Sequence, residues 1–433
     1  MSRHRLAPIL LVSTALSACA APATDDPPSH LAAALESSAV AVVDLGRDHV
    51  SGDVWHHSLT LRIGEEPNAL LRLHRVVREK APWVPARTSA AAILMHGDFS
   101  SFASNFAPVL ADPAAAEGMA VDLARRGIDV WGIDRRWAVA PQDADLSDFG
   151  GMDLEQELDD IDAALAVVRA IRAANGGSAR PHLVGFSRGG FLAYAYAARD
   201  GQRPAGQRTI RGLVPLDVWA AIPPEDTDAR AWFCEGAAFE YQLVADGVVD
   251  SENSFLIAVG ELALGDPKGP SPFFDGLSNR EAMMAVAGQT YQVFAVNPYY
   301  HLAAPFLDES GAVTGLRESS ETDIARWFAE ATPHQSMIEA ADVDAVWCGD
   351  GSGPAVDLSR IRVPLFYLGA AGGFGDHGLY TTTLVSSADV TTQVIRRFGP
   401  EGAFEDFGHG DLLFASDAPA LAWQPLAQWL ATH

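Results

Sequence analysis

Apolar and polar positions alternate in short runs along the first part of the chain. Runs typical of β-strands lie at 40–45, 58–63 and 70–77, and the turn-rich link between the last two predicts an antiparallel hairpin at a sheet edge. From residue 90 onward apolar strands alternate with helical segments. Strands are expected at 90–96, 129–134, 182–186 and 210–216, and helices at 113–126 and 153–174. This alternation predicts an α/β fold in which helices cover both faces of a mostly parallel central sheet.

The strands resume only after a long segment of different composition. Residues 218–356 combine many aromatic residues with prolines, glycines and short helical stretches. Because a structureless loop of this length is improbable in a compact domain, we expect a large, mainly helical lid (cap). Strands at 361–369 and 391–398 and a closing helix at 418–431 complete the pattern. The predicted core therefore comprises residues 40–217 and 357–433, with the lid between them.

The N-terminus has the pattern of an export signal. A basic start is followed by an apolar run, 6–16, that is too short for a stable membrane span. The run leads into Leu-Ser-Ala-Cys, which resembles the lipobox of bacterial lipoproteins. We therefore expect residues 1–19 to be a signal peptide with a lipobox, Cys19 to be the lipidated residue and 20–39 to be a flexible tether.

This interpretation places the protein outside the cytoplasm. Ala20 rather than an aspartate follows Cys19, which in the lipoprotein pattern favours the outer membrane. We expect a bacterial lipoprotein at the outer membrane or the periplasmic face, in contact with the membrane through the lipid on Cys19. The alternative is a secreted protein cleaved near Ala18 or Ala21.

The strongly acidic composition argues against some classes of binding partner. The chain has 56 acidic and 30 basic residues, a net charge of −26, which argues against nucleic acid and against electrostatic adhesion to anionic lipid. His56, His57 and His377 lack companion ligands at metal spacing, and no glycine motif for dinucleotides follows a strand, so we expect neither a metal nor a cofactor. Cys234 and Cys348 could form a disulfide in an oxidising compartment, or remain separate buried thiols.

The most informative motif is Gly185-Phe186-Ser187-Arg188-Gly189. A strand-like run enters it and a run of helix-forming residues follows it, as in a nucleophile elbow, where a serine sits on a strained strand-to-helix turn. The glycines are needed there because side chains would collide with the neighbouring strand and helix. The simpler alternative is that Ser187 only caps a helix.

A serine nucleophile needs a base, and the base needs an orienting carboxylate. His409 lies between two glycines after the strand at 391–398, and Asp376 lies in a glycine-rich loop after the strand at 361–369. Asp217, directly after the strand at 210–216, is an alternative acid, and His377 is an alternative base. Two aspartates near His409 are expected to be solvated or to cap turns, and these are Asp406 and Asp411.

The order Ser187, Asp376, His409 resembles that of the α/β-hydrolase-fold serine hydrolases of the esterase and lipase type. The resemblance implies an α/β-hydrolase fold with the lid inserted after its sixth strand. It also implies cleavage of carboxylic ester or related acyl bonds through an acyl-enzyme intermediate. Serine peptidase or acyltransferase activity on the same fold is an alternative, and so is a non-catalytic surface protein that only binds.

The resemblance also indicates an oxyanion hole. The segment His96-Gly97-Asp98 resembles the family's His-Gly-x motif, so the backbone N–H groups of Asp98 and Arg188 are the expected donors. The alternative is that His96-Gly97 is a simple turn. A carboxylate beside an oxyanion is unfavourable unless it pairs with a cation. Three arginines are candidate partners for it, namely Arg135, Arg136 and Arg188.

Substrate contacts are less well defined by the sequence. Phe99 follows the oxyanion motif, and Arg135 and Arg136 follow a strand at the edge where ligands bind in open α/β sheets. The two arginines could bind a substrate carboxylate, or could neutralise acidic neighbours. The aromatic lid favours a small-molecule ester or lipid-like substrate with an apolar acyl or aromatic group, although most of these aromatics are expected to form the lid's own core.

Overall fold

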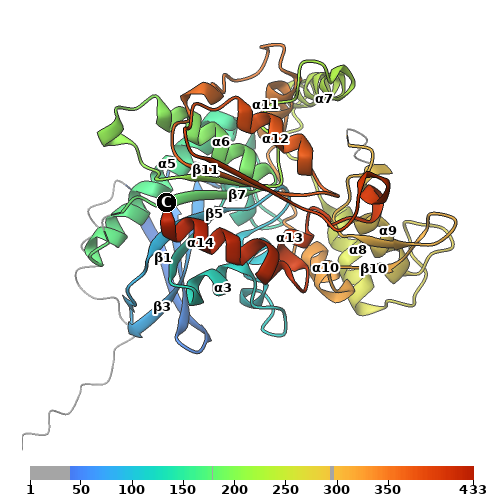
Figure 1. Cartoon of the computed structure of the whole chain (residues 1–433), viewed down its shortest axis with the longest axis horizontal. Coiled ribbons are helices and arrows are strands. Elements are labelled where there is room, and N and C mark those ends of the chain that lie inside the picture. The colour runs from blue at the N-terminus through green and yellow to red at the C-terminus, as the bar shows by residue number, and fades with distance from the viewer. Residues whose placement is uncertain (1–39, 178, 293–296) are drawn as a thin grey trace, which may run out of the picture.

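The structure is a computed structural model, and it describes residues 40–177, 179–292 and 297–433 (Figure 1). Within these residues ten strands form one sheet in the order β1-β2-β3-β6-β5-β7-β8-β11-β12, and β4 pairs with the end of β3. The strands are β1 (Ala41–Ser51), β2 (Val54–Arg62), β3 (Leu70–Ala81), β4 (Val84–Pro85), β5 (Ala90–Met95), β6 (Ile128–Asp134), β7 (His182–Phe186), β8 (Leu213–Leu216), β11 (Leu365–Ala370) and β12 (Val390–Ile395). From β6 to β12 all neighbouring strands are parallel.

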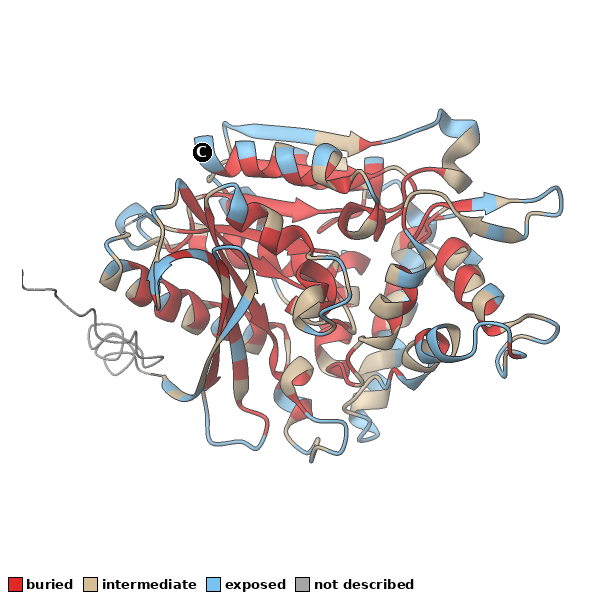
Figure 2. Cartoon of the chain, turned by 90° about the horizontal axis from the view of Figure 1, so that it is seen from below, coloured by how far each residue is buried: buried red, intermediate tan, exposed pale blue. Residues whose placement is uncertain are grey.

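Helices cover both faces of this sheet, and the side-chain alternation of the strands explains why. Along β7, Leu183 points to one core and Val184 to the other, as the period of two in a strand requires. The first core contains α5 (Leu154–Ala174) and α6 (Arg188–Gly201), and the second contains α3 (Met119–Arg125) and α14 (Gln424–Thr432). In Figure 2 the central strands and the inner faces of these helices are buried, whereas the edge strands β1 and β12 and the outer faces of the helices are largely exposed or intermediate.

The mostly parallel sheet predicted from the sequence is confirmed. Strands β1, β2 and β3 pair antiparallel at one edge, as expected for the hairpin. The helix expected at 113–126 was wrong in its start, because α3 begins only at Met119. Gly118 precedes it with φ +84°, and a side chain there would collide with Phe106 and Pro108, so the chain turns sharply before the helix.

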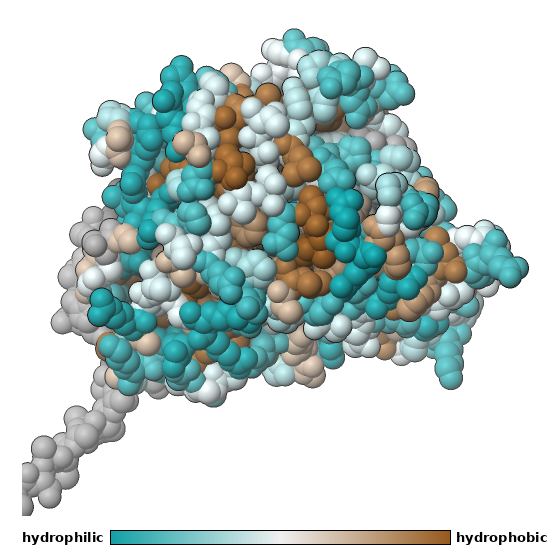
Figure 3. All heavy atoms as spheres, viewed as in Figure 1, coloured by the Kyte–Doolittle hydropathy of each residue, from teal (hydrophilic) through white to brown (hydrophobic). Residues whose placement is uncertain are grey.

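Shorter helices connect these elements, and most of them lie next to the carboxyl ends of the strands. They are α2 (Phe102–Phe106), α4 (Arg136–Val139), α12 (Leu379–Thr383) and α13 (Asp411–Phe414). A π-helical turn, Pro419–Trp423, leads into α14. On the face drawn in Figure 3, hydrophobic residues reach the surface as separate patches between hydrophilic ones.

Residues 218–356 lie between β8 and β11, and we call them the inserted segment. It is mainly helical, and its elements are α7 (Thr227–Ala245), α8 (Ser254–Gly265), α9 (Asn279–Gly288), the antiparallel pair β9 (Pro305–Leu307) and β10 (Val313–Leu316), α10 (Glu321–Ala329) and α11 (Met337–Cys348). Helices α8, α9 and α10 share a small hydrophobic core. Helices α7 and α11 pack together in a separate group (Figure 1).

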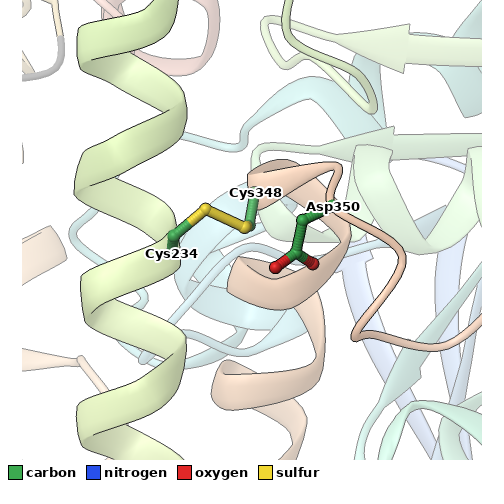
Figure 4. A group of neighbouring side chains, drawn as sticks. All are labelled: Cys234, Cys348 and Asp350. Carbon is green, nitrogen blue, oxygen red and sulfur yellow. A yellow bond between two sulfur atoms is a disulfide. The ribbon is translucent and has the colours of Figure 1, made fainter.

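A disulfide between Cys234 and Cys348 joins α7 to α11 and spans 114 residues of sequence (Figure 4). Asp350 lies beside it, so one ligand atom from each of these three residues lies within 4.8 Å of the others, a spacing compatible with a metal site. Both sulfurs are in the disulfide, however, and a metal needs the thiolate. Of the two alternatives expected for Cys234 and Cys348, the structure has the disulfide.

The predicted signal peptide, the lipidation site Cys19 and the tether 20–39 lie outside the described residues. Among the residues that are described, no helix has the length and apolar character needed to cross a membrane.

The disulfide predicts a measurable contribution to stability. Replacing both cysteines, Cys234→Ser with Cys348→Ser, should lower the free energy of unfolding by about 2 to 5 kcal/mol, because the bridge restricts a long loop in the unfolded chain. Chemical denaturation of the double variant and the wild type would measure the difference. Equal unfolding curves would show that the bridge does not stabilise the inserted segment.

Candidate active site

Ser187 sits on a strained turn between β7 and α6. Its backbone has φ 55° and ψ −129°, in the left-handed region that non-glycine residues rarely adopt. A Cβ at Gly185 would collide with the Gly189 carbonyl, and one at Gly189 would collide with the Met95 carbonyl on β5. Ser187 occupies the N-cap position of α6, but its hydroxyl makes no capping hydrogen bond. The hydroxyl therefore has no helix-capping role.

His409 lies in the same cavity as Ser187. Its Nδ1 donates to Oδ2 of Asp217 at 2.7 Å, and its ring stacks on Phe186 with centroids 4.4 Å apart. The backbone N–H of His409 donates to the carbonyl of His301 in the inserted segment at 3.0 Å. These contacts fix the plane and the tautomer of the imidazole, and Nε2 is the ring nitrogen that does not bond to Asp217.

Asp217 is fully buried directly after β8. Besides His409, its carboxylate accepts from three backbone N–H groups at 2.8 to 3.0 Å, one from Ala370 at the end of β11 and two from Phe374 and Gly375 in the loop that follows. A Cβ at Gly373 would collide with the same carboxylate. The glycine-rich loop therefore wraps closely around Asp217.

The expectation that Asp376 orients His409 is wrong in this structure. The Asp376 side chain is 57% exposed and pairs with Arg396 at 2.7 Å. The glycine-rich loop donates backbone N–H groups to Asp217. Asp376 follows these donors in the chain and lies at the surface. The alternative acid, Asp217, is the one that contacts the base.

The remaining acid and base candidates have other partners. His377 Nε2 is 3.0 Å from the Tyr299 hydroxyl and does not line the cavity. Asp406 accepts from the backbone of Arg397 at 2.6 Å. Asp411 accepts from Ala304 and Gly408 at 2.9 and 2.7 Å. Both aspartates hold turns, as expected.

The segment after β5 approaches Ser187 closely. A Cβ on Gly97 would lie 3.0 Å from Cβ of Ser187, so only glycine fits without movement. Burial lowers the pKa of His96 to about 3, so its ring is neutral and its Nδ1 donates to the Gly97 carbonyl at 2.9 Å. Within the described part of the chain, the backbone N–H groups of Asp98 and Arg188 have no acceptor, and both residues line the cavity.

The Asp98 carboxylate turns away to a cation. Arg188 Nε donates to its two oxygens at 3.1 and 3.3 Å, and Gln335 Nε2 donates to Oδ1 at 2.6 Å. Of the three arginines considered from the sequence, Arg188 is the partner. The guanidinium of Arg188 also lies 5.0 Å from the ring centroid of Trp347.

Arg135 and Arg136 do not line the cavity, so their assignment as substrate contacts is corrected. Both are buried. Arg136 forms two hydrogen bonds with Asp160 at 2.7 and 2.8 Å. Arg135 donates to the Gly97 carbonyl at 3.2 Å and lies 3.6 Å from Glu339. They neutralise buried acidic neighbours and support the segment after β5.

The cavity has a volume of about 710 Å³ and reaches from Ser187 into the inserted segment. The side of the cavity at α8, α9 and α10 is mainly apolar, and its walls include Phe255, Leu256, Leu277, Ala285, Val286, Trp327 and Phe328. The side at α7 and α11 carries Trp232 and Trp347 together with Glu240 and Asp344. Phe99, expected as a substrate contact, also lines the cavity.

Several of these residues were not found from the sequence. Gln335 and Glu240 lie in ordinary helical or loop contexts without a motif, so no local pattern distinguishes them. Asp217 did have a signal, since it directly follows the last residue of a buried strand. Its position at a strand end places it at the edge of the sheet where ligands bind in α/β folds.

Comparison with known proteins supports the fold. No family model matches the chain, and no curated protein matches it. Among solved structures, a candidate lipase from Sulfolobus solfataricus aligns with a TM-score of 0.61 at 16% identity, covering 90% of this chain and 99% of that one. A soluble variant of the monoglyceride lipase from Saccharomyces cerevisiae, solved with a substrate analogue, aligns with a TM-score of 0.47 at 11% identity, covering 91% and 96%.

At such identities the likeness establishes the fold alone. The sheet order, the strand-turn-helix unit at Ser187 and the match to the Sulfolobus structure together show that the chain has an α/β-hydrolase fold, as the sequence predicted. The similar structures include lipases and esterases.

Because acidic residues line one side of the cavity, we expect the free energy of unfolding to depend on pH. Burial, followed by the nearby Asp344 carboxylate, raises the pKa of Glu240 to about 8. A carboxyl group with a raised pKa contributes stability that is fully present below its unfolded value near 4.5 and is lost as the pH rises to about 8. The free energy of unfolding of Glu240→Gln should therefore increase relative to wild type over this range, at up to about 1.4 kcal/mol per pH unit.

Denaturant unfolding of both proteins at pH 5 and pH 8.5 would measure this shift. Glu235→Gln, at an exposed position of the same helix, is the matched control. A difference between Glu240→Gln and wild type that does not change with pH would contradict the prediction.

Proposed function

We propose that the protein is a serine hydrolase that cleaves carboxylic esters with an apolar acyl group through an acyl-enzyme intermediate. The observation that carries this proposal is the buried Asp217–His409 hydrogen bond in the same cavity as Ser187 on its strained turn. A hydroxyl, an imidazole and a carboxylate are the three groups that such a nucleophile requires.

The reaction follows from the positions of these groups. Ser187 Oγ attacks the ester carbonyl carbon, and His409 Nε2 takes the hydroxyl proton. Asp217 stabilises the resulting imidazolium through Nδ1. The carbonyl oxygen becomes an anion and accepts hydrogen bonds from the N–H groups of Asp98 and Arg188, which have no other acceptor in the described residues.

The intermediate then collapses. The bond from carbon to the alkoxy oxygen breaks, and His409 returns the proton to that oxygen, so the alcohol leaves. A water molecule repeats the sequence on the acyl-enzyme, with His409 again as the base. The products are the carboxylic acid and free Ser187.

The shape of the cavity supports an apolar acyl group. The side formed by α8, α9 and α10 has mainly apolar walls, whereas the charged residues among the described lining lie at Asp98, Arg188 and His409 and on α7 and α11. Trp232 and Phe255 line the cavity and are 47% and 44% exposed.

Covalent labelling with a fluorophosphonate tests the proposal. The wild type should be phosphonylated at Ser187, with loss of fluoride, and Ser187→Ala should not react. Peptide mass mapping identifies the modified residue. If the wild type stays unmodified while a reference esterase reacts under the same conditions, the protein is not a serine hydrolase.

The same reaction tests the acyl preference when a decyl and an ethyl phosphonofluoridate are compared. The decyl compound should react faster with the wild type. Ala285→Trp, which fills the apolar side of the cavity, should remove this advantage and leave the ethyl compound unaffected. Equal rates for both compounds in the wild type would exclude an apolar acyl site there.

The identity of the acid predicts the effect of two substitutions. Asp217→Asn should lower kcat for ester hydrolysis about 10⁴-fold, because an asparagine presents the wrong partner to Nδ1 and cannot stabilise the imidazolium. Asp376→Asn breaks only an exposed ion pair and should leave kcat within about twofold. A large loss in the second variant and none in the first would reverse the assignment.

A further inference from the structure

The inserted segment holds the loop that carries one oxyanion donor. This loop, residues 97–100, contacts Thr332 and Gln335, which lie between α10 and α11. The Phe99 N–H donates to Gln335 Oε1 at 3.2 Å, and the Thr332 N–H donates to the Phe99 carbonyl at 2.9 Å. Gln335 Nε2 also donates to Asp98 Oδ1 at 2.6 Å. Both hydrogen-bonding groups of the Phe99 backbone are thus satisfied from the inserted segment.

The amide of Gln335 has one orientation that fits these neighbours. Its oxygen must face the Phe99 N–H, and its nitrogen must face the Asp98 carboxylate. In the reverse orientation the amide oxygen would face the carboxylate, and the amide N–H groups would face the Phe99 N–H, so neither contact would be a hydrogen bond. Gln335 is 2% exposed. Its own N–H donates to Asp250 Oδ1 at 3.0 Å, and its carbonyl accepts from Ser251 at 2.9 Å. The side chain is therefore anchored at its base and bonded at its tip.

Phe99 needs this support because its backbone is strained. Its φ of 47° lies in the left-handed region, which costs a bulky residue on the order of 1 to 2 kcal/mol. Asp98, whose N–H faces the cavity, is its direct neighbour. A relaxation of Phe99 would rotate the Asp98–Phe99 peptide and, through Asp98, shift the adjoining Gly97–Asp98 peptide, whose N–H is the oxyanion donor. A displacement of such a group by about 1 Å can cost about 100-fold in rate.

We propose that Gln335 is a positioning residue that sets the oxyanion hole from the inserted segment. The proposal rests on the proposed function, because the hole acts only if Ser187 attacks an acyl group. Gln335 fixes both sides of the Asp98–Phe99 peptide, by holding the carboxylate of Asp98 with Arg188 and by holding the N–H of Phe99. The inserted segment then contributes to the rate of the chemical step as well as to substrate binding.

Three variants test this role with the p-nitrophenyl ester that the wild type hydrolyses best. Gln335→Met preserves the approximate shape and removes both hydrogen bonds. It should lower kcat about 10- to 100-fold and change KM less than twofold. Gln335→Glu keeps the acceptor for Phe99 but opposes a carboxylate to Asp98, and it should lose more activity than Gln335→Met.

Adding Asp98→Asn to Gln335→Glu restores a donor and acceptor pair with reversed polarity, since the new amide can donate to the new carboxylate. This double variant should recover kcat at least tenfold over Gln335→Glu alone. A residue that only stabilised the fold would not give this recovery. Gln242→Met, at an exposed position of α7 outside the cavity, is the control and should match the wild type.

Two results would overturn the proposal. One is a kcat for Gln335→Met equal to that of Gln242→Met. The other is a kcat for the double variant Gln335→Glu, Asp98→Asn that equals the kcat of Gln335→Glu alone. This second result can be obtained even if Gln335→Met does not fold. Failure of the proposed function is a different outcome, because the wild type itself would then not react with the fluorophosphonate.

Discussion

The buried carboxylate of Asp217 is the constraint around which the site is arranged. A carboxylate without solvent is costly unless every lone pair finds a donor, and this one accepts three backbone N–H groups and the Nδ1 proton of His409. Those donors come from the end of β11, from the loop after it and from the segment after β12. A single buried anion therefore holds together the ends of three strands and fixes the height of the imidazole above the sheet.

Backbone strain marks the same region. Among the described residues, four that are not glycine have positive φ, and three of them belong to the site, namely Phe99, Ser187 and Asp217. Strained residues persist only where surrounding contacts hold them. Here each is held from a different direction, Ser187 by close packing of the elbow glycines, Asp217 by the β11 loop and Phe99 by the inserted segment.

The elements that carry Ser187 and His409, the proposed nucleophile and base, could be predicted from the sequence because each has a local signature. The strand before Ser187 is a short, mostly apolar run, and the elbow glycines are required by contacts within a few residues or with the next strand. The acid could not be assigned in the same way. A glycine-rich loop that ends in an aspartate has the same pattern whether it presents Asp376 or wraps around Asp217, and only the three-dimensional contact separates the two.

Gln335 illustrates a different limit. Its partners Asp98 and Phe99 are more than 200 residues away in the sequence, and a single glutamine between two helices has no periodicity or motif. Its significance arises only when the inserted segment folds back on the core. Residues of this kind depend on tertiary contacts that no local pattern encodes.

The inserted segment cannot be exchanged independently of the core, because it contacts the loop that carries His409. The backbone carbonyls of His301 and Leu302 accept hydrogen bonds from the N–H groups of His409 and Gly410. Residues of the inserted segment therefore supply acceptors for the backbone of the loop that carries His409. Exchanging residues 218–356 for the cap of another hydrolase would change these acceptors together with the substrate cavity. In this protein a new specificity gained by such an exchange would require a compatible set of backbone contacts, and point substitutions within the existing walls are the more accessible route for evolution or design.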